Sequence, residues 1–273
     1  MPELPEVETT RRGVEPHLIG RVVAEIELRE RRMRWPVQDD VLTITGEKIT
    51  TVRRRAKYLL IGSESGTLIL HLGMSGSLRI CPHDADIRKH DHFLLRLANN
   101  QSLRLHDPRR FGAVLWHSHS DGELAQNTLF NHLGPEPLDE EFSDDYFFKS
   151  CAQRNTVIKQ HIMNNRIVVG VGNIYACEAL FRSGIHPKRK AGKVSKTRLH
   201  NLHGEIRTVL TEAIEQGGTT LRDFVNESGQ PGYFKQQLHV YGREGLPCTT
   251  CGSGIKRIVI GNRSTFYCSQ CQR

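Results

Sequence analysis

The spacing of apolar side chains divides the chain into regions of different character. Residues 6–19 place Val7, Val14 and Leu18 on one face at helical spacing, and this segment ends at Gly20. From Val22 to Trp116 the pattern becomes short alternating runs, broken by Gly, Pro, Asn and Asp. Many strands without intervening helices predict an antiparallel sandwich or barrel. The clearest expected strands are residues 22–26, 58–61, 68–72 and 103–105.

Helical spacing returns after residue 155. We expect helices over residues 156–163, 174–183 and 195–216, the second capped by Asn173 and the third closed by Gly217 and Gly218. Residues 117–150 carry two prolines and an acidic patch, which indicates a boundary region with a short helix. Residues 217–236 are rich in glycine, which suits a mobile loop over a pocket.

The most specific chemical signal is a pair of cysteine motifs near residue 273. Cys248-x2-Cys251 is followed after sixteen residues by Cys268-x2-Cys271. Four thiolates at this spacing predict one tetrahedral zinc ion, and the absence of an open ligand position makes it structural. Between the motifs, the sequence predicts a hairpin that turns at Gly261-Asn262, with Arg263 at its tip.

The charge balance narrows the class of partner. A formal net charge of +8 favours a polyanion, most simply nucleic acid, although ribosome-associated and membrane-surface proteins share this balance. The chain has no apolar run of about 20 residues and no secretory start, so it is expected to have no membrane partner. Three scattered cysteines and one metal motif fit a cytoplasmic protein better than a disulfide framework.

Two segments of the second half have simple alternative interpretations. Six cations fall within eleven residues without an acid, and a solvated loop accounts for them: Lys188, Arg189, Lys190, Lys193, Lys196 and Arg198. Gly170-Val171-Gly172-Asn173 precedes a predicted helix, where backbone N–H groups can hold a phosphate or simply form a tight turn. It matches neither a P-loop nor a dinucleotide fingerprint.

The residues after Met1 contain a candidate nucleophile. Removal of Met1 makes Pro2 a secondary amine, and an α-amino group titrates near pH 7.7–8.0, so a good part of it is unprotonated at neutral pH. Such an amine attacks a sugar aldehyde carbon to give an iminium, with Glu3 available as a general acid. The alternative is an ordinary helix start, with Pro5 in the first turn and Glu6 at the positive end.

Two predicted loops each carry a large apolar residue beside glycine or arginine. In residues 107–112 (DPRRFG), Phe111 suits a wedge in the minor groove and Arg109 a contact to a base edge. In residues 71–76 (HLGMSG), Met74 suits the space left by a flipped base, although a loop methionine usually packs in a core.

Taken together, these motifs resemble the formamidopyrimidine-DNA glycosylase family over nearly the whole chain. The matching motifs, in the family's order, are PELPEVE, RRAKYLL, HLGMSGSLR, DPRRFG, LGPEP, VVGVGNIYA, QGGTTLRDF, GYF, VYGREG-x-PC and RSTFYCSQCQ. The resemblance implies an α+β multidomain fold. Its parts are an N-terminal catalytic β-sandwich with a flanking helix (1–131), a linker (132–149), a helix–two-turn–helix DNA-binding domain (150–237) and a zinc-finger hairpin (238–273).

The resemblance also implies a function and a set of roles. It implies a monomeric bifunctional DNA glycosylase and AP lyase of base excision repair, associated with a bacterial nucleoid, that acts on oxidised purines in double-stranded DNA. Pro2 is implied as the nucleophile, Glu3 as the ring-opening acid and Glu6 as a supporting carboxylate. Lys57 is implied to aid β-elimination and Arg263 to aid δ-elimination. The trio that fills the gap of the everted nucleotide is Met74, Arg109 and Phe111, and the implied DNA-backbone contacts are His90, Asn155, Lys159 and Asn173.

One departure and three alternatives remain open. The family's turn before the first helix of the second domain is usually rich in Lys and Arg, but here it reads Gln153-Arg154-Asn155, so the contact from Asn155 is neutral. The alternatives are an endonuclease VIII-like enzyme for oxidised pyrimidines, a non-catalytic zinc-ribbon DNA-binding protein, and an RNA- or ribosome-associated basic protein.

Overall fold

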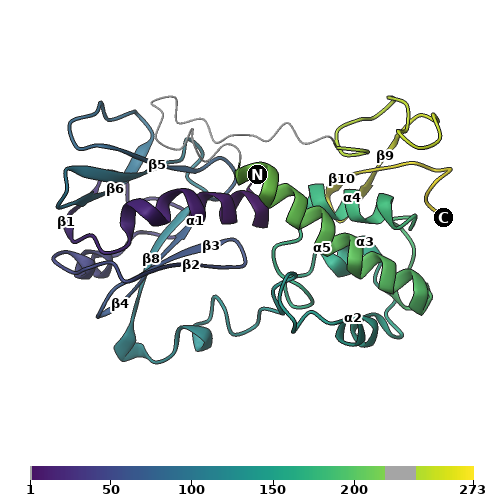
Figure 1. Ribbon diagram of the computed structural model, residues 1–273, viewed down its shortest axis with the longest axis horizontal. Coiled ribbons are helices and arrows are strands. Elements are labelled where there is room, and N and C mark those ends of the chain that lie inside the picture. The colour runs from purple at the N-terminus through teal and green to yellow at the C-terminus, as the bar shows by residue number, and fades with distance from the viewer. Residues whose placement is uncertain (1, 219–237) are drawn as a thin grey trace. The chain divides into compact units, whose positions relative to one another are not determined.

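The computed structural model describes residues 2–218 and 238–273, and they form two compact units. The first unit holds the residues up to Asn131 together with the end of the longest helix from Ile214. The second unit holds residues 132–213 and the described residues after 237. Figure 1 shows the elements of both units along the colour ramp. Each unit is described by itself.

The first helix, α1 (Leu4–Leu18), begins two residues earlier than the apolar spacing predicts. Glu3 is its N-cap, and a capping box forms in which the Glu6 carboxylate accepts a hydrogen bond from the backbone N–H of Glu3 at 2.7 Å. A proline lies in the first turn, where the missing N–H costs nothing. Leu4, Val7, Val14 and Leu18 are buried and fix the helix to the sandwich, as its apolar face predicts.

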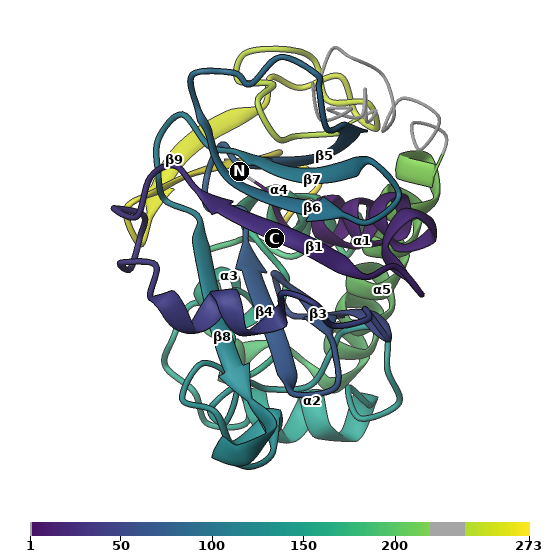
Figure 2. The same cartoon turned by 90° about the vertical axis from the view of Figure 1, so that its left-hand side faces the viewer.

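Eight strands of the first unit form two four-stranded antiparallel sheets, which confirms the predicted sandwich. One sheet has the order β1-β6-β7-β5 and the other β2-β3-β4-β8, and Figure 2 shows the two as separate layers. The strands of the first sheet are β1 (Val23–Leu28), β5 (Ser77–Pro82), β6 (Asp91–Leu97) and β7 (Gln101–His106). Those of the second are β2 (Thr51–Arg55), β3 (Tyr58–Gly62), β4 (Gly66–His71) and β8 (Ala113–Ser118).

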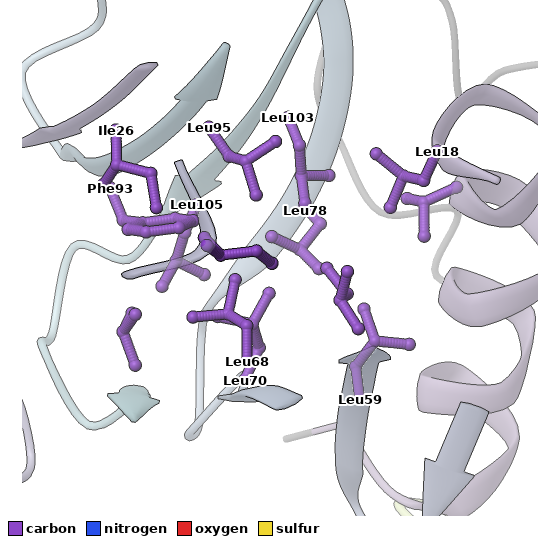
Figure 3. Packing of buried hydrophobic residues seen from close by; sticks show 14 of the residues in the cluster. Leu18, Ile26, Leu59, Leu68, Leu70, Leu78, Phe93, Leu95, Leu103 and Leu105 are labelled. Atoms are coloured by element: carbon purple, nitrogen blue, oxygen red, sulfur yellow. The ribbon is translucent and has the colours of Figure 1, made fainter. Parts of the chain in front are cut away.

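The core of this unit lies between the two sheets and under α1. Figure 3 shows leucines of both sheets pointing toward one another, among them Leu68 and Leu70 of β4 and Leu103 and Leu105 of β7. These residues alternate with other side chains at a spacing of two, so each strand directs every second side chain into the same layer. Leu18 brings α1 into the same cluster.

The second unit is helical and has its own core. Its helices are α2 (Asp144–Cys151), α3 (Ile158–Ile162), α4 (Asn173–Arg182) and α5 (Lys196–Gly218), the last of which continues into the first unit. Buried residues of all four helices pack in one cluster that includes Phe147, Ile162, Leu180 and Leu202. The predicted helices are therefore present. Gly217 and Gly218 are the last residues of α5, and the rest of the predicted loop 217–236 lies outside the described residues.

One local prediction in this unit is wrong. Asn173 does not cap α4, because Gly172 occupies the N-cap position and no side-chain cap bond forms. The Asn173 side chain is committed elsewhere: its amide group donates to the backbone oxygen of Ser264 at 2.9 Å. A tertiary contact has therefore replaced the local capping bond.

The described residues after 237 form the predicted hairpin, with β9 (Lys256–Ile260) and β10 (Arg263–Tyr267) paired antiparallel. Gly261 (φ +55°) and Asn262 (φ +59°) make the two-residue turn. Positive φ at both positions is the type I′ geometry, whose twist matches that of paired strands. Among the described residues, no helix is both long enough and apolar enough to cross a membrane.

Candidate functional site

Pro2 precedes Glu3, the N-cap of α1, and is half-buried. The next residue, Glu3, is 1% exposed, and its side chain accepts a hydrogen bond from the backbone N–H of Glu6 within the capping box. Glu3 and Glu6 are thus held in fixed positions by the first turn of the helix. The adjoining backbone of Pro2 is fixed with them, so the Pro2 nitrogen has a defined location.

Lys57 occupies the two-residue turn between β2 and β3, where Arg55 pairs with Tyr58. Its neighbour Ala56 adopts φ +52°, which is uncommon for a residue with a side chain. The Ala56 methyl group is nevertheless buried. Packing therefore holds a strained turn and presents Lys57 at the tip of the hairpin.

Two contacts between α1 and β2 place Pro2 and Lys57 at the same end of this pair of elements. Arg11 donates to the backbone oxygen of Val52 at 3.3 Å, and Arg54 donates to the Glu8 carboxylate at 3.2 Å. The C-terminal end of β2, which leads into the turn with Lys57, therefore lies beside the N-terminal end of α1. Pro2 lies six residues before Glu8, and Lys57 lies three residues after Arg54, so both lie beyond these contacts toward the same end.

A neutral histidine lies beside Lys57. Burial, and then the positive charges of Arg34 and Lys57, lower the pKa of His71 to about 4. Its Nδ1 accepts a hydrogen bond from the backbone N–H of Gly73 at 2.9 Å, and its ring packs on Tyr58. His71 therefore stays uncharged at neutral pH and adds no further positive charge at the hairpin. Sequence reasoning missed this residue, because a single histidine carries no distinguishing pattern.

The structure brings Met74, Arg109 and Phe111 together on two touching loops. Gly73 has φ +61°, and a Cβ there would lie 2.4 Å from the backbone carbon of Phe111, so the two loops are in backbone contact. Met74 and Phe111 are exposed by 39% and 45%, and the Arg109 guanidinium lies over the Phe111 ring at 4.9 Å. Three side chains suited to the inside of a base stack thus project from one place.

Asp107 ties these two loops to each other and was missed by the sequence analysis. Its side chain is fully buried, and Oδ1 accepts from the Ser75 hydroxyl at 3.0 Å while Oδ2 accepts from the backbone N–H of Gly112 at 2.7 Å. Oδ1 also accepts from the backbone N–H of Arg109 at 3.3 Å, which is an Asx turn. The Asp-Pro pair before the arginines is the sequence signal that identifies such a turn.

We expect Asp107→Asn to loosen both loops while Met74, Arg109 and Phe111 remain in place in the sequence. An amide keeps one acceptor oxygen but turns a donor toward a second donor, so we expect a loss of about 2 kcal/mol in unfolding free energy. Urea unfolding measures this loss, and affinity for a lesion duplex measures the effect on the loops. Ser75→Ala breaks only the bond that joins the loops and should cost about 1 kcal/mol. The exposed Asp84→Asn is the matched control, and an equal effect of that variant would contradict the assignment.

His90 lies next to a buried network of charges in the first sheet. Its ring is 5.8 Å from that of His106, whose Nδ1 is 3.0 Å from the Asp91 carboxylate. Burial raises the pKa of Asp91, but the Arg88 backbone N–H, His106 and Arg79 together hold it below its usual value. The backbone oxygen of His90 also accepts from the N–H of Asp107 at 2.9 Å. His90 is therefore fixed beside the loop that carries Arg109.

In the second unit, Lys159 and Asn173 form one hydrogen-bonded group with β10. The ammonium group of Lys159 donates to Asn173 Oδ1 and, at 2.6 Å, to the Thr265 hydroxyl. Lys159 is only 1% exposed. The group joins α3, α4 and the hairpin, and it therefore fixes the strand that begins with Arg263.

The remaining predicted contacts of this unit are exposed. Arg263 is the first residue of β10, directly after the type I′ turn, as the sequence predicts. Asn155 lies in the turn before α3, and its side-chain oxygen accepts from the ammonium group of Lys190 at 3.2 Å. The neutral Asn155 therefore has a positive charge directly beside it.

The four cysteines meet in the geometry that zinc requires. Their sulfur atoms all lie within 4.8 Å of one another, with Cys248 and Cys271 at 3.9 Å and Cys251 and Cys268 at 3.5 Å. Zn–S bonds of about 2.3 Å in a tetrahedron place sulfur atoms about 3.8 Å apart, so these residues fit one zinc ion with four thiolate ligands. The metal would hold the ends of the hairpin segment together and leave no position for a substrate.

A sandwich that carries a proline-led helix, and a helical unit that carries a four-cysteine hairpin, is the layout of a DNA-repair glycosylase. Three family models match the chain in this order. They are the formamidopyrimidine-DNA glycosylase N-terminal domain (residues 1–114), the formamidopyrimidine-DNA glycosylase H2TH domain (residues 133–225) and a zinc finger found in FPG and IleRS (residues 245–273).

The chain belongs to the formamidopyrimidine-DNA glycosylase family. It is 58% identical to the formamidopyrimidine-DNA glycosylase of Thioalkalivibrio sulfidiphilus and 50% identical to that of Escherichia coli, with all of each chain covered. A solved complex of Lactococcus lactis Fpg with an N7-benzyl-Fapy-dG-containing DNA matches the whole chain at 34% identity with a TM-score of 0.90. Like the family, this protein is a DNA glycosylase of base excision repair with AP lyase activity and a structural zinc finger.

Proposed function

We propose that this protein removes oxidised purines, 8-oxoguanine and formamidopyrimidines, from duplex DNA and then cuts the strand on both sides of the exposed sugar. The observation that carries the proposal is the position of Pro2 at the same end of α1 and β2 as Lys57. Solved complexes of Lactococcus lactis Fpg with DNA that contains Fapy-dG or an abasic site support the lesion class. The protein is proposed to work as a monomer at the bacterial nucleoid, with domain limits near residues 131, 149 and 237.

The chemistry begins with the lone pair of the Pro2 nitrogen. It attacks C1′ of the everted nucleotide, the bond from C1′ to the base breaks, and the base leaves with the proton that the Pro2 nitrogen gives up. Glu3 protonates the ring oxygen so that the sugar opens to an iminium, with Glu6 in support. The cation acidifies the C2′ proton. Loss of that proton expels the 3′ phosphate with the aid of Lys57, and a second elimination expels the 5′ phosphate with the aid of Arg263.

The remaining residues hold the DNA in the required form. Eversion of the nucleotide costs a few kcal/mol of stacking and pairing, and Met74 and Phe111 fill the space that it leaves. Arg109 then reads the partner cytosine. His90, Asn155 and Asn173 are proposed to contact the DNA backbone directly, and Lys159 is proposed to act through Asn173. Since Lys159 is buried against Asn173 and Thr265, its charge acts on the backbone chiefly by orienting Asn173.

The test compares two lesions in otherwise identical duplexes. We expect 8-oxoguanine opposite cytosine to be cleaved at least about tenfold faster than an oxidised pyrimidine, a difference of roughly 1.4 kcal/mol in barrier. The comparison is needed because Lactococcus lactis Fpg has also been solved with an oxidised-pyrimidine-containing DNA. A faster reaction on the pyrimidine lesion would favour the endonuclease VIII-like alternative. The absence of any borohydride-trapped complex would favour a binding protein without catalysis.

A further inference from the structure

The segment from His186 to Lys193 contains a cationic hollow that the proposed reaction does not use. The hollow is open and has a volume of about 550 Å³, and its lining is His186, Lys188, Arg189, Lys193 and Arg273. Among the residues that the structure describes, no acidic side chain lines it. The sequence interpretation of a solvated loop does not account for a concave surface.

The cationic side chains of this hollow are not paired with carboxylate side chains of the described residues. The structure gives the side chains of Lys188, Arg189, Lys193 and Arg273 no hydrogen bond or ion pair with a described residue. The positive charges of Lys188 and Arg189 act, after burial, to lower the pKa of His186. Like charges held together at a concave surface repel one another, and a bound anion relieves this repulsion.

Backbone hydrogen bonds fix the basic segment against the turn that carries Asn155. The N–H of Ile158 donates to the Arg189 oxygen at 2.7 Å, and that of Ala191 donates to the Thr156 oxygen at 2.9 Å. Val157 and Lys190 form an antiparallel bridge. The basic segment thus lies along the turn that carries the neutral Asn155.

The hollow also lies at the far end of the strand that begins with Arg263. The His186 ring packs edge-on against Tyr267 with ring centres 4.8 Å apart, and Tyr267 ends β10. Arg263 and Tyr267 are four residues apart, so their side chains point to one face of the strand about 14 Å apart. This distance equals roughly four base-pair steps of 3.4 Å.

We propose that this hollow binds the phosphodiester backbone of DNA, as an accessory contact made by Lys188, Arg189 and Lys193. It supplies the positive charge that the turn at Asn155 lacks, and it increases affinity for DNA of any sequence. The proposal rests on the proposed function insofar as the protein acts on duplex DNA. It adds no step to the chemistry.

The test is the salt dependence of binding to an undamaged duplex, measured by fluorescence anisotropy. Each lost lysine–phosphate contact lowers the slope of log K against log salt by about 1. We therefore expect Lys188→Gln/Lys193→Gln to lower that slope by about 2 and to weaken binding to all sequences equally. The matched control is Arg21→Gln/Lys48→Gln, which removes the same charge from the first unit, where neither side chain forms a hydrogen bond or ion pair with a described residue. This control should leave the slope unchanged.

Three outcomes overturn the accessory contact. The first is an unchanged salt slope in the Lys188/Lys193 variant, and the second is an equal change of slope in this variant and in the control. The third is an unchanged salt slope for DNA together with lost binding of poly-glutamate in the Lys188/Lys193 variant, which would assign the hollow to an acidic peptide. Single-turnover cleavage of a lesion duplex at saturating enzyme should be unaffected in both variants. If the unaltered protein itself fails to cleave that duplex, the proposed function fails, which is distinct from failure of the hollow.

Discussion

Blocking the nitrogen of Pro2 is expected to abolish strand cleavage. One extra residue before Pro2, or retained Met1, converts the secondary amine into an amide whose lone pair is delocalised and no longer nucleophilic. We expect cleavage of a lesion duplex to fall at least about a thousandfold, as when a covalent nucleophile is lost in other enzymes. Cleavage assays, borohydride trapping and mass analysis of the N-terminus measure the effect together.

Two further variants separate the nucleophile from the helix that carries it. Pro2→Gly keeps a primary amine of lower basicity and greater freedom, and we expect it to abolish strand cleavage. Pro5→Ala removes a proline from the first turn of α1 but leaves the amine intact, and it should retain activity within a few-fold. A preparation that retains Met1 and is fully active would contradict the proposed chemistry.

Removal of zinc is expected to have the second largest effect, on the hairpin that carries Arg263. The cluster around the metal ligands contains few apolar residues, among them Cys177, Phe181, Val240 and Ile255. A two-stranded hairpin is at best marginally stable alone, whereas a structural zinc ion contributes on the order of 10 kcal/mol to folding. We therefore expect a chelator, or Cys271→Ala, to release one zinc ion per chain and to weaken DNA binding at least about tenfold.

Cys177→Ala provides the control for this experiment. Cys177 is buried in the same cluster but is not one of the four cysteines that meet, so its variant should retain the metal. The readouts are zinc content by a colorimetric chelator and protection of the β9–β10 amides from hydrogen exchange. Loss of zinc from Cys177→Ala, or full amide protection in the metal-free protein, would argue against the assignment.

Much of the fold follows from local sequence patterns. Period-two spacing predicts the sandwich strands, and Gly261-Asn262 predicts the type I′ turn, because only these local conformations suit the residues. The cysteine spacing predicts the metal quartet, because two CxxC pairs supply the four thiolates of one zinc site. The cap of α4 could not be predicted this way, since Asn173 is held by Ser264, which is 91 residues further along the chain.

The candidate site divides in a similar way. Motifs suggest Pro2, Met74, Arg109, Phe111 and Arg263, because each belongs to an unusual local sequence. The residues that support them leave weaker signals, as with the buried Asp107 and the neutral His71. Their roles depend on contacts between separate loops and strands, which the spacing of residues in one segment does not encode. The burial of Lys159 likewise depends on contacts with other segments and is not encoded in its local sequence.

The type I′ turn has a consequence for how this sequence can diverge. Gly261 has φ +55°, in the left-handed region that asparagine and aspartate also adopt, and an added Cβ would lie 2.6 Å from the end of the flexible Gln160 side chain, which can move aside. Gly122 has φ +96° and ψ −164°, a backbone region that essentially only glycine occupies, although no atom lies within 4 Å of its added Cβ. Evolutionary drift is accordingly open to asparagine or aspartate at Gly261 and closed at Gly122, although the two glycines look alike in the bare sequence.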